Sequence, residues 1–158
     1  MTVLPDFPLP ATTGLHLRMV ANLKALTAVG LESHVLWFST PGRRCGEVDL
    51  DEIAKLASGV RHGGQRVEQH ELPLLRRLIS KVRFASMGLT GWPRTNYPYS
   101  IRYDAIGGAE ALRTEAKRLK PDAVILPSQL MHWCEVLDPS VTVVIDAADV
   151  LTDVTARL

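Results

Sequence analysis

Two acidic side chains near the end of the chain stand where carboxylates often do chemistry. Asp146 and Asp149 follow the apolar run Val141–Ile145, which is typical of a buried β-strand. In parallel sheets, ligands bind outside the carboxyl ends of the strands, and a carboxylate there can orient a hydroxyl or accept its proton. We predict Asp149 as a catalytic residue and Asp146 as a substrate-binding residue. Alternatively, Asp149 caps a helix and Asp146 is solvated, each contributing at most about 1 kcal/mol.

A second candidate site is the first strand-to-helix connection, PLPATTGLHLR. Gly14 lets the backbone approach a ligand closely, and the helix start offers free amides that suit a phosphate or a sugar hydroxyl. Thr13 stands at that helix start, and Arg18 lies about one turn inside the helix. We predict that Thr13, Gly14 and Arg18 bind substrate. A plain tight turn is the alternative, because the segment contains neither a dinucleotide fingerprint nor a Walker A motif.

Further polar residues follow the predicted strand Ala123–Leu126. Ser128 stands at its carboxyl end, and His132 precedes Trp133 in a short predicted helix. We predict that Ser128 and His132 bind substrate, the histidine with Trp133 by stacking on a sugar; a structural histidine is the alternative. The two cysteines and five histidines have no metal-binding spacing, so we expect no metal.

The segment Leu74–Leu89 carries basic residues on an apolar helical pattern. Its sequence, LLRRLISKVRFASMGL, contains Arg76, Arg77, Lys81 and Arg83 and no acidic residue. A basic amphipathic helix can lie on an anionic membrane surface, so we predict these four residues as membrane-surface contacts. The alternative is a helix that packs on the sheet with a solvated basic face.

The elements that must position these residues alternate along the chain. Apolar runs predict strands at Thr2–Leu4, Ser33–Ser39, Ala123–Leu126 and Val141–Ile145, and a weak alternation predicts one at Gln65–Leu72. Helical patterns separate them, at 15–30, Leu50–Ala57, Leu74–Leu89, within Tyr103–Lys120 and at Gln129–Leu137, with another from Leu151; Thr90–Pro98 reads as a loop. Thr12 or Thr13 can cap the first of these helices and Gly30 can end it. Gly107-Gly108 weakens the helical pattern of Tyr103–Lys120, whose later part is strongly helical. This alternation predicts an α/β, three-layer Rossmann-like domain with a mostly parallel sheet, in which Ser33–Ser39, Ala123–Leu126 and Val141–Ile145 are central.

The bulk composition narrows the classes of protein. The 158 residues suit one domain, and 46% apolar and 22% charged residues are ordinary for a globular chain. A net charge of +1 gives no general attraction to nucleic acid, so we expect no nucleic-acid partner. The chain shows no secretory signal and no run of about 18 apolar residues. We therefore expect a cytoplasmic location, with peripheral contact at the cytosolic membrane face through Leu74–Leu89.

Three segments, in the same order, resemble a known family. They are "LPDFPLPATTGLHLRMVANLKALTAVGLESHVLWFST", "KRLKPDAVILPS" and "SVTVVIDAADVLTD". Each resembles a motif of the N-terminal, acceptor-side domain of family 4 glycosyltransferases of GT-B fold. The resemblance implies that residues 1–158 form this domain, and that a C-terminal domain absent from this chain binds the nucleotide-sugar donor. It further implies transfer, with retention, to a saccharide or lipid-linked acceptor. We expect this chain alone to be inactive, because one domain supplies only one reactant.

Some positions depart from the family pattern. Leu126-Pro127-Ser128 stands where the family often has a histidine, Ala148 replaces a second histidine, and Leu151 replaces a glutamate. These departures keep a second hypothesis open: a non-catalytic, truncated α/β domain that binds carbohydrate, a membrane surface or a protein partner. An unrelated flavodoxin-like or Rossmann domain is a third, which the missing glycine fingerprint disfavours.

Overall fold

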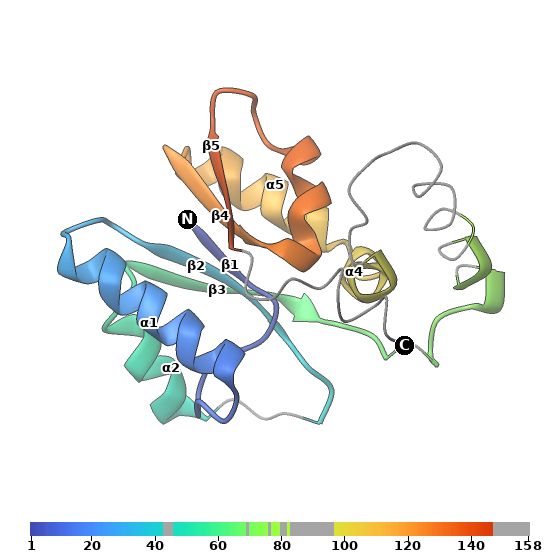
Figure 1. Cartoon of the computed structure of the whole chain (residues 1–158), viewed down its shortest axis with the longest axis horizontal. Coiled ribbons are helices and arrows are strands. Elements are labelled where there is room, and N and C mark those ends of the chain that lie inside the picture. The colour runs from blue at the N-terminus through green and yellow to red at the C-terminus, as the bar shows by residue number, and fades with distance from the viewer. Residues whose placement is uncertain (43–45, 69, 76, 80–81, 83–96, 147–158) are drawn as a thin grey trace.

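A computed structural model of the chain describes residues 1–42, 46–68, 70–75, 77–79, 82 and 97–146. Five parallel strands form one sheet in the order β3-β2-β1-β4-β5 (Figure 1). The strands are β1 (Thr2–Leu4), β2 (His34–Ser39), β3 (Gly59–Gln65), β4 (Ala123–Pro127) and β5 (Thr142–Asp146). The predicted α/β class with a mostly parallel sheet is confirmed.

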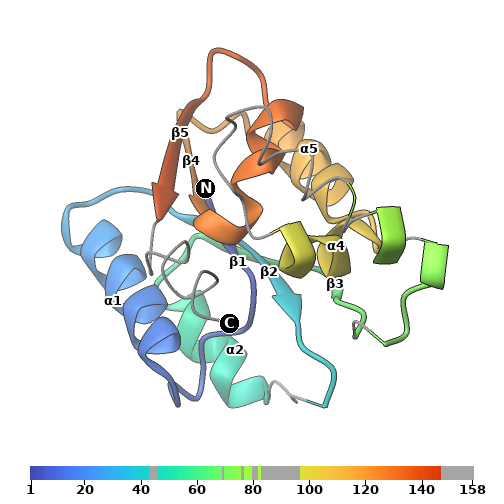
Figure 2. The same ribbon diagram turned by 45° about the vertical axis from the view of Figure 1, so that its right-hand side comes forward.

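Helices cover both faces of this sheet, as right-handed crossovers between parallel strands require. On one face lie α1 (Gly14–Ala28) and α2 (Glu47–Ala54); on the other lie α4 (Tyr97–Asp104), α5 (Gly108–Leu119) and the 3-10 helix η1 (Ser128–Val136) (Figure 2). Alternate strand residues therefore enter different cores. Leu4 packs with Met19 and Leu23 of α1, whereas Val3 packs in the core that contains Leu112 and Trp133.

The ends of α1 follow from its sequence. Thr13 is the N-cap, with extended backbone, and its hydroxyl accepts a hydrogen bond from the His16 N–H at 3.3 Å. At the other end Gly30 has φ +74°, a left-handed conformation that glycine adopts at low cost. The N–H groups of Gly30 and Leu31 bond back to Thr27 and Leu26. Both predicted helix-end signals are confirmed.

One predicted strand is misplaced, and the bounds of other elements differ from those predicted. The strand predicted at Gln65–Leu72 lies earlier: β3 ends at Gln65, and its sequence, GVRHGGQ, lacks an apolar pattern because this edge strand pairs only with β2. The predicted helix within Tyr103–Lys120 is α5, and the weakness predicted at Gly107-Gly108 is a break between α4 and α5, where Gly107 has φ +74°. The loop predicted at Thr90–Pro98 overlaps the start of α4 at Tyr97, and residues 90–96 are outside the described ones. The second predicted helix, Leu50–Ala57, instead spans Glu47–Ala54.

The order of the strands corrects one further expectation. The predicted strand Val141–Ile145 corresponds to β5, which is at an edge of the sheet and not in its centre. Val144 and Ile145 are 47% and 40% exposed there, so an apolar sequence did not mean burial on both faces. The central strand is β1, which is only three residues long but pairs with β2 and β4.

Two predicted helices fall wholly or partly outside the described residues. In Leu74–Leu89, residues 74–75, 77–79 and 82 have helical backbone, and 76, 80–81 and 83–89 are not described. The helix predicted from Leu151 lies entirely outside. Among the described residues, no helix has the length and apolar character needed to cross a bilayer.

Candidate functional site

The first connection, residues 5–13, is held against the start of α1 by polar contacts. His16 is 4% exposed, and its Nε2 lies 3.4 Å from Oδ2 of Asp6. The other oxygen of Asp6 accepts a hydrogen bond from the Phe7 N–H at 2.9 Å. The sequence analysis missed this His16–Asp6 pair, because nothing in their spacing indicates that the loop folds back on the helix. The pair fixes where α1 begins.

A tyrosine from the opposite side of the sheet supports the same loop. The Tyr103 hydroxyl, at the end of α4, donates a hydrogen bond to the carbonyl of Pro5 at 2.8 Å. Burial raises the pKa of Tyr103 above its ordinary value, so the phenol remains protonated and able to donate at neutral pH. The loop after β1 is therefore anchored from both sides.

Asp146 ends β5 and joins it to α1. Its carboxylate lies 2.5 Å from the guanidinium of Arg18 and accepts a hydrogen bond from the Asn22 side-chain amide at 3.0 Å. Arg18 and Asn22 are four residues apart, so they lie on one face of α1. The structure thus brings together two predicted residues, Arg18 and Asp146, and adds Asn22, which sequence reasoning missed although its i, i+4 spacing from Arg18 could have indicated it.

A small cavity of about 90 Å³ opens beside this cluster. Its lining includes the apolar side chains of Met19 and Ile125 and the polar side chains of Thr2, Asn22, Ser128 and Asp146. It lies between α1 and strands β1 and β4. The connections from these two neighbouring strands run in opposite directions, to β2 on one side and to β5 on the other. Such a switch point is where doubly wound sheets bind ligands. We call this cavity and its lining the crevice.

One buried hydroxyl in the crevice lacks a partner. Thr2 is 4% exposed, and within the described part of the chain its Oγ1 has no hydrogen-bond partner. A buried hydroxyl without a partner is destabilising, so its presence on a cavity wall points toward a bound polar group. No sequence signal indicated Thr2, because its place inside the crevice depends on the packing of α1.

The other predicted substrate-binding residues are placed as follows. Gly14 begins α1 at the carboxyl edge of the sheet, and a Cβ there would meet no atom within 4 Å, so the space in front of it is open. Thr13 is next to it, but its hydroxyl caps the helix. Asp149 lies outside the described residues.

His132 is not in the crevice lining. Its Nε2 lies 3.2 Å from Asp104, whose carboxylate also accepts a hydrogen bond from the Trp133 indole at 2.6 Å. Trp133 is 1% exposed and packs edge-on against Phe38 and Tyr103. The predicted stacking of a sugar on Trp133 is therefore wrong, because the ring is in the core. His132 and Trp133 instead tie η1 to α4.

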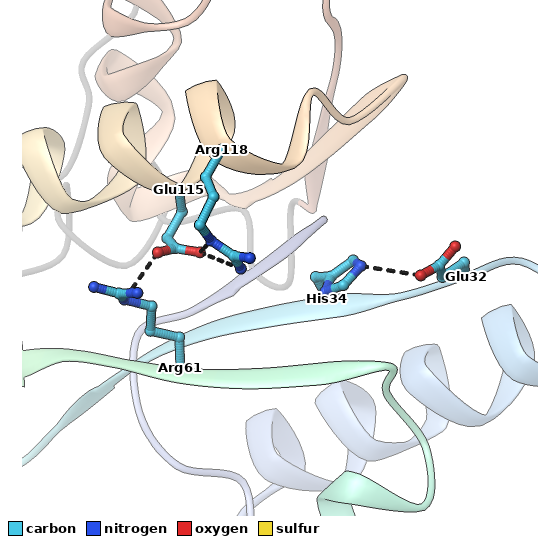
Figure 3. A network of polar contacts seen from close by, with 5 residues as sticks. All are labelled: Glu32, His34, Arg61, Glu115 and Arg118. Atoms are coloured by element: carbon cyan, nitrogen blue, oxygen red, sulfur yellow. Dashed lines mark hydrogen bonds and ion pairs between the residues drawn. The ribbon is translucent and has the colours of Figure 1, made fainter.

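A second carboxylate cluster lies at the opposite, amino edge of the sheet (Figure 3). Glu115 of α5 is 2% exposed, and Arg61 of β3 approaches one of its oxygens at 2.8 Å. Arg118 donates two hydrogen bonds to the other oxygen, at 3.0 and 2.8 Å. Nearby, His34 lies 3.2 Å from Glu32. Because the arginines of β3 and α5 form ion pairs with this carboxylate, the cluster joins α5 to β3.

Two larger hollows, lined by described residues, are also at this amino edge. One of about 420 Å³ lies beside Glu115, and one of about 710 Å³ lies between the end of α5 and the start of β5. Their size alone would favour them as ligand sites. However, parallel sheets bind ligands at the carboxyl ends of their strands and not at the amino edge. The second hollow is, in addition, lined by the end of a helix and a turn. We therefore take the smaller crevice at the carboxyl edge as the candidate site.

No family model, no curated protein and no solved structure matches this chain. The site therefore rests on the geometry of the chain itself. Among the described residues no group of three histidine, cysteine or acidic side chains could hold a metal ion.

Proposed function

We propose that this chain is the acceptor-binding half of a glycosyltransferase and receives a saccharide, or the saccharide of a lipid-linked acceptor, in the crevice. One observation carries the proposal: a carboxylate, an amide and an unpartnered buried hydroxyl line one cavity at the switch point of the sheet. The ordered resemblance of three sequence segments to family 4 glycosyltransferases supports it.

The chemistry of the crevice suits a neutral polyhydroxyl ligand. Arg18 compensates the charge of Asp146, so the cluster has no net charge to attract a phosphate or another anion. A sugar hydroxyl both donates and accepts hydrogen bonds. It can therefore donate to the Asp146 carboxylate and accept from the Asn22 amide, while Thr2 can bond in either direction.

The size of the crevice fits one half of a shared site. Its volume of about 90 Å³ is well below the roughly 300–1,000 Å³ that encloses a whole small molecule. It holds one edge of a sugar ring. The C-terminal domain that the resemblance implies would supply the opposite wall together with the nucleotide-sugar donor.

In the proposed reaction the acceptor hydroxyl oxygen forms a bond to the anomeric carbon of the donor, and the bond from that carbon to the nucleotide phosphate breaks. The acceptor proton passes to a base or to the departing phosphate. We assign the role of base to Asp149 and the orientation of the acceptor to Asp146, which Arg18 and Asn22 hold in place. A lipid-linked acceptor would place the reaction on the cytosolic face of a membrane.

The proposal is tested by titrating the ¹⁵N-labelled chain with methyl glycosides of glucose, galactose, mannose and N-acetylglucosamine. We expect at least one glycoside to shift the amide signals of Thr2, Asn22, Ser128 and Asp146 in a saturable way. Inorganic phosphate is the matched anionic probe and should leave these signals in place. Saturable shifts with phosphate and none with any glycoside would contradict the proposal.

A binding domain without catalysis is the second candidate function. One observation favours it: the described carboxylate in the crevice is already bonded to Arg18 and Asn22 and is not placed to act as a base. The two functions separate when the chain is joined to a donor domain and given a nucleotide sugar and the glycoside that binds. Product formation that disappears in Asp149→Asn supports the enzyme, and glycoside binding without product supports the binding domain.

A further inference from the structure

The segment that follows β3 has an apolar surface that the described fold does not cover. Leu74, Leu75, Leu78, Ile79 and Val82 are between 53% and 76% exposed. Leu72, just before them, is 3% exposed, so the segment is anchored in the domain at its start. Soluble monomers rarely expose apolar side chains in such a contiguous group, and a group of this kind marks an interaction site.

These five side chains share one face of a helix. The described residues at 74–75, 77–79 and 82 have helical backbone. At helical spacing the five apolar positions fall within an arc of about 140°. This arc is the apolar face of an amphipathic helix, and its exposure contradicts the alternative in which the same residues pack against the sheet.

The charge of the sequence around this face has one sign. No acidic residue occurs between Glu71 and Asp104, whereas Arg76, Arg77, Lys81 and Arg83 occur within eight positions. These four basic residues belong to the same segment as the apolar face. An apolar face in a segment rich in basic residues and free of acidic ones matches the acyl and anionic headgroup layers of a membrane surface, while a protein partner would need an acidic rim around an apolar groove.

We infer that residues 72–83 dock the domain on an anionic phospholipid membrane, with the five apolar side chains inserted and the basic side chains at the headgroups. The docking is independent of the crevice. If the chain fails to bind vesicles, the proposed glycoside binding can still be correct. If no glycoside binds, the proposed membrane docking can still be correct.

The test is cosedimentation of the full chain with vesicles of phosphatidylcholine mixed with phosphatidylglycerol, and with vesicles of phosphatidylcholine alone. We expect binding to the mixed vesicles and little to the neutral ones. Binding should weaken strongly at about 1 M salt, where the Debye length is about 3 Å. Equal binding to both vesicle types, or none to either, would overturn the inference.

Variants test the contributions of the basic and the apolar side chains separately. Changing Arg76, Arg77, Lys81 and Arg83 to Gln should lower partitioning about a thousandfold. Leu74→Ser with Leu78→Ser should lower it about a hundredfold without changing net charge. The matched control changes four exposed lysines elsewhere, Lys24, Lys55, Lys117 and Lys120, to Gln and should bind as the parent does. An equal loss in this control would show only a response to net charge and would overturn the inference.

Self-association is measured in parallel, because a second copy of the chain is the other occupant of an exposed apolar face. Sedimentation velocity over a range of concentrations should show a monomer. A concentration-dependent dimer that Leu74→Ser with Leu78→Ser abolishes, with no vesicle binding, would assign the face to a dimer and overturn the membrane inference. Unchanged thermal unfolding confirms that each variant is folded.

Discussion

The two edges of the sheet each hold a carboxylate bound by arginine, but in different surroundings. At the amino edge, Glu115 forms ion pairs with Arg61 and Arg118, which come from two different elements. At the carboxyl edge, Asp146 is bonded to Arg18 and Asn22 of a single helix and borders a cavity. The first arrangement links two parts of the fold. The second places a carboxylate on the wall of the crevice.

Removing the cations from the amino edge should produce the largest change in stability. In Arg61→Met with Arg118→Met, Glu115 would remain buried without a counter-charge, and we expect the free energy of unfolding to fall by about 3 kcal/mol. Urea unfolding at pH 7 measures this change. Glu115→Met is the control: it leaves two arginines that are more than half exposed and can be hydrated, so it should cost below about 1 kcal/mol. An equal decrease in the free energy of unfolding in the two variants would show that the loss does not come from a buried Glu115 without a counter-charge.

Loss of the hydrogen bond from Tyr103 to the loop after β1 should give the next largest change in the free energy of unfolding. Tyr103→Phe removes the hydrogen bond to the Pro5 carbonyl, and we expect a loss of about 1–2 kcal/mol. The pKa of Tyr103 is raised in the folded state, so above about pH 10 the unfolded chain releases this proton while the folded chain retains it. The parent should therefore lose stability above pH 10 more steeply than Tyr103→Phe. Parallel pH profiles of the two proteins would contradict this assignment.

The sequence predicted the parts of the fold that depend on local pattern. Apolar runs gave β2, β4 and β5, and the threonine and glycine signals gave both ends of α1. It failed at β3, because an edge strand with three glycines has no period-two pattern, and it misplaced β5 in the centre, because strand order depends on the whole fold.

The candidate site could be predicted only in part. Ser128 and Asp146 were found because each stands at the carboxyl end of a predicted strand, and Arg18 because it lies about one turn inside the helix that follows the first strand. Thr2 and Asn22 were missed because their roles depend on how α1 packs across β1 and β4. His132 was placed wrongly for a similar reason: its neighbour Trp133 is fixed in the core by contacts with Phe38 and Tyr103, which are distant in sequence.

At the carboxyl edge, loss of the arginine should matter more for binding than for stability. Arg18→Met leaves Asp146 bonded to Asn22, and since the Arg18 side chain is 46% exposed the stability loss should be below about 1 kcal/mol. Glycoside binding should weaken about tenfold, because the Asp146 carboxylate loses the charged hydrogen bond that holds it in place for the acceptor. Arg113→Met is the matched control, with a side chain 43% exposed in an ion pair with Glu110. It should show the same small stability loss and unchanged glycoside binding. Unchanged binding in Arg18→Met would remove Arg18 from the site.

The smallest effect on stability should come from two buried hydroxyls that lack partners within the described part of the chain. They are Thr2 in the crevice and Ser33 at the amino edge, each 4% exposed. Thr2→Val and Ser33→Ala each remove a desolvated hydroxyl at nearly constant shape, so both should raise the free energy of unfolding by up to about 1 kcal/mol. They should differ in binding. Ser33→Ala should bind the glycoside as the parent does, whereas Thr2→Val should bind it about tenfold more weakly, because the ligand hydroxyl would face a methyl group. Urea unfolding and the glycoside titration measure the two quantities in the same variants. If Thr2→Val gains stability and keeps full affinity, the Thr2 hydroxyl does not contact the ligand, and the sugar is held by the Asp146 cluster alone.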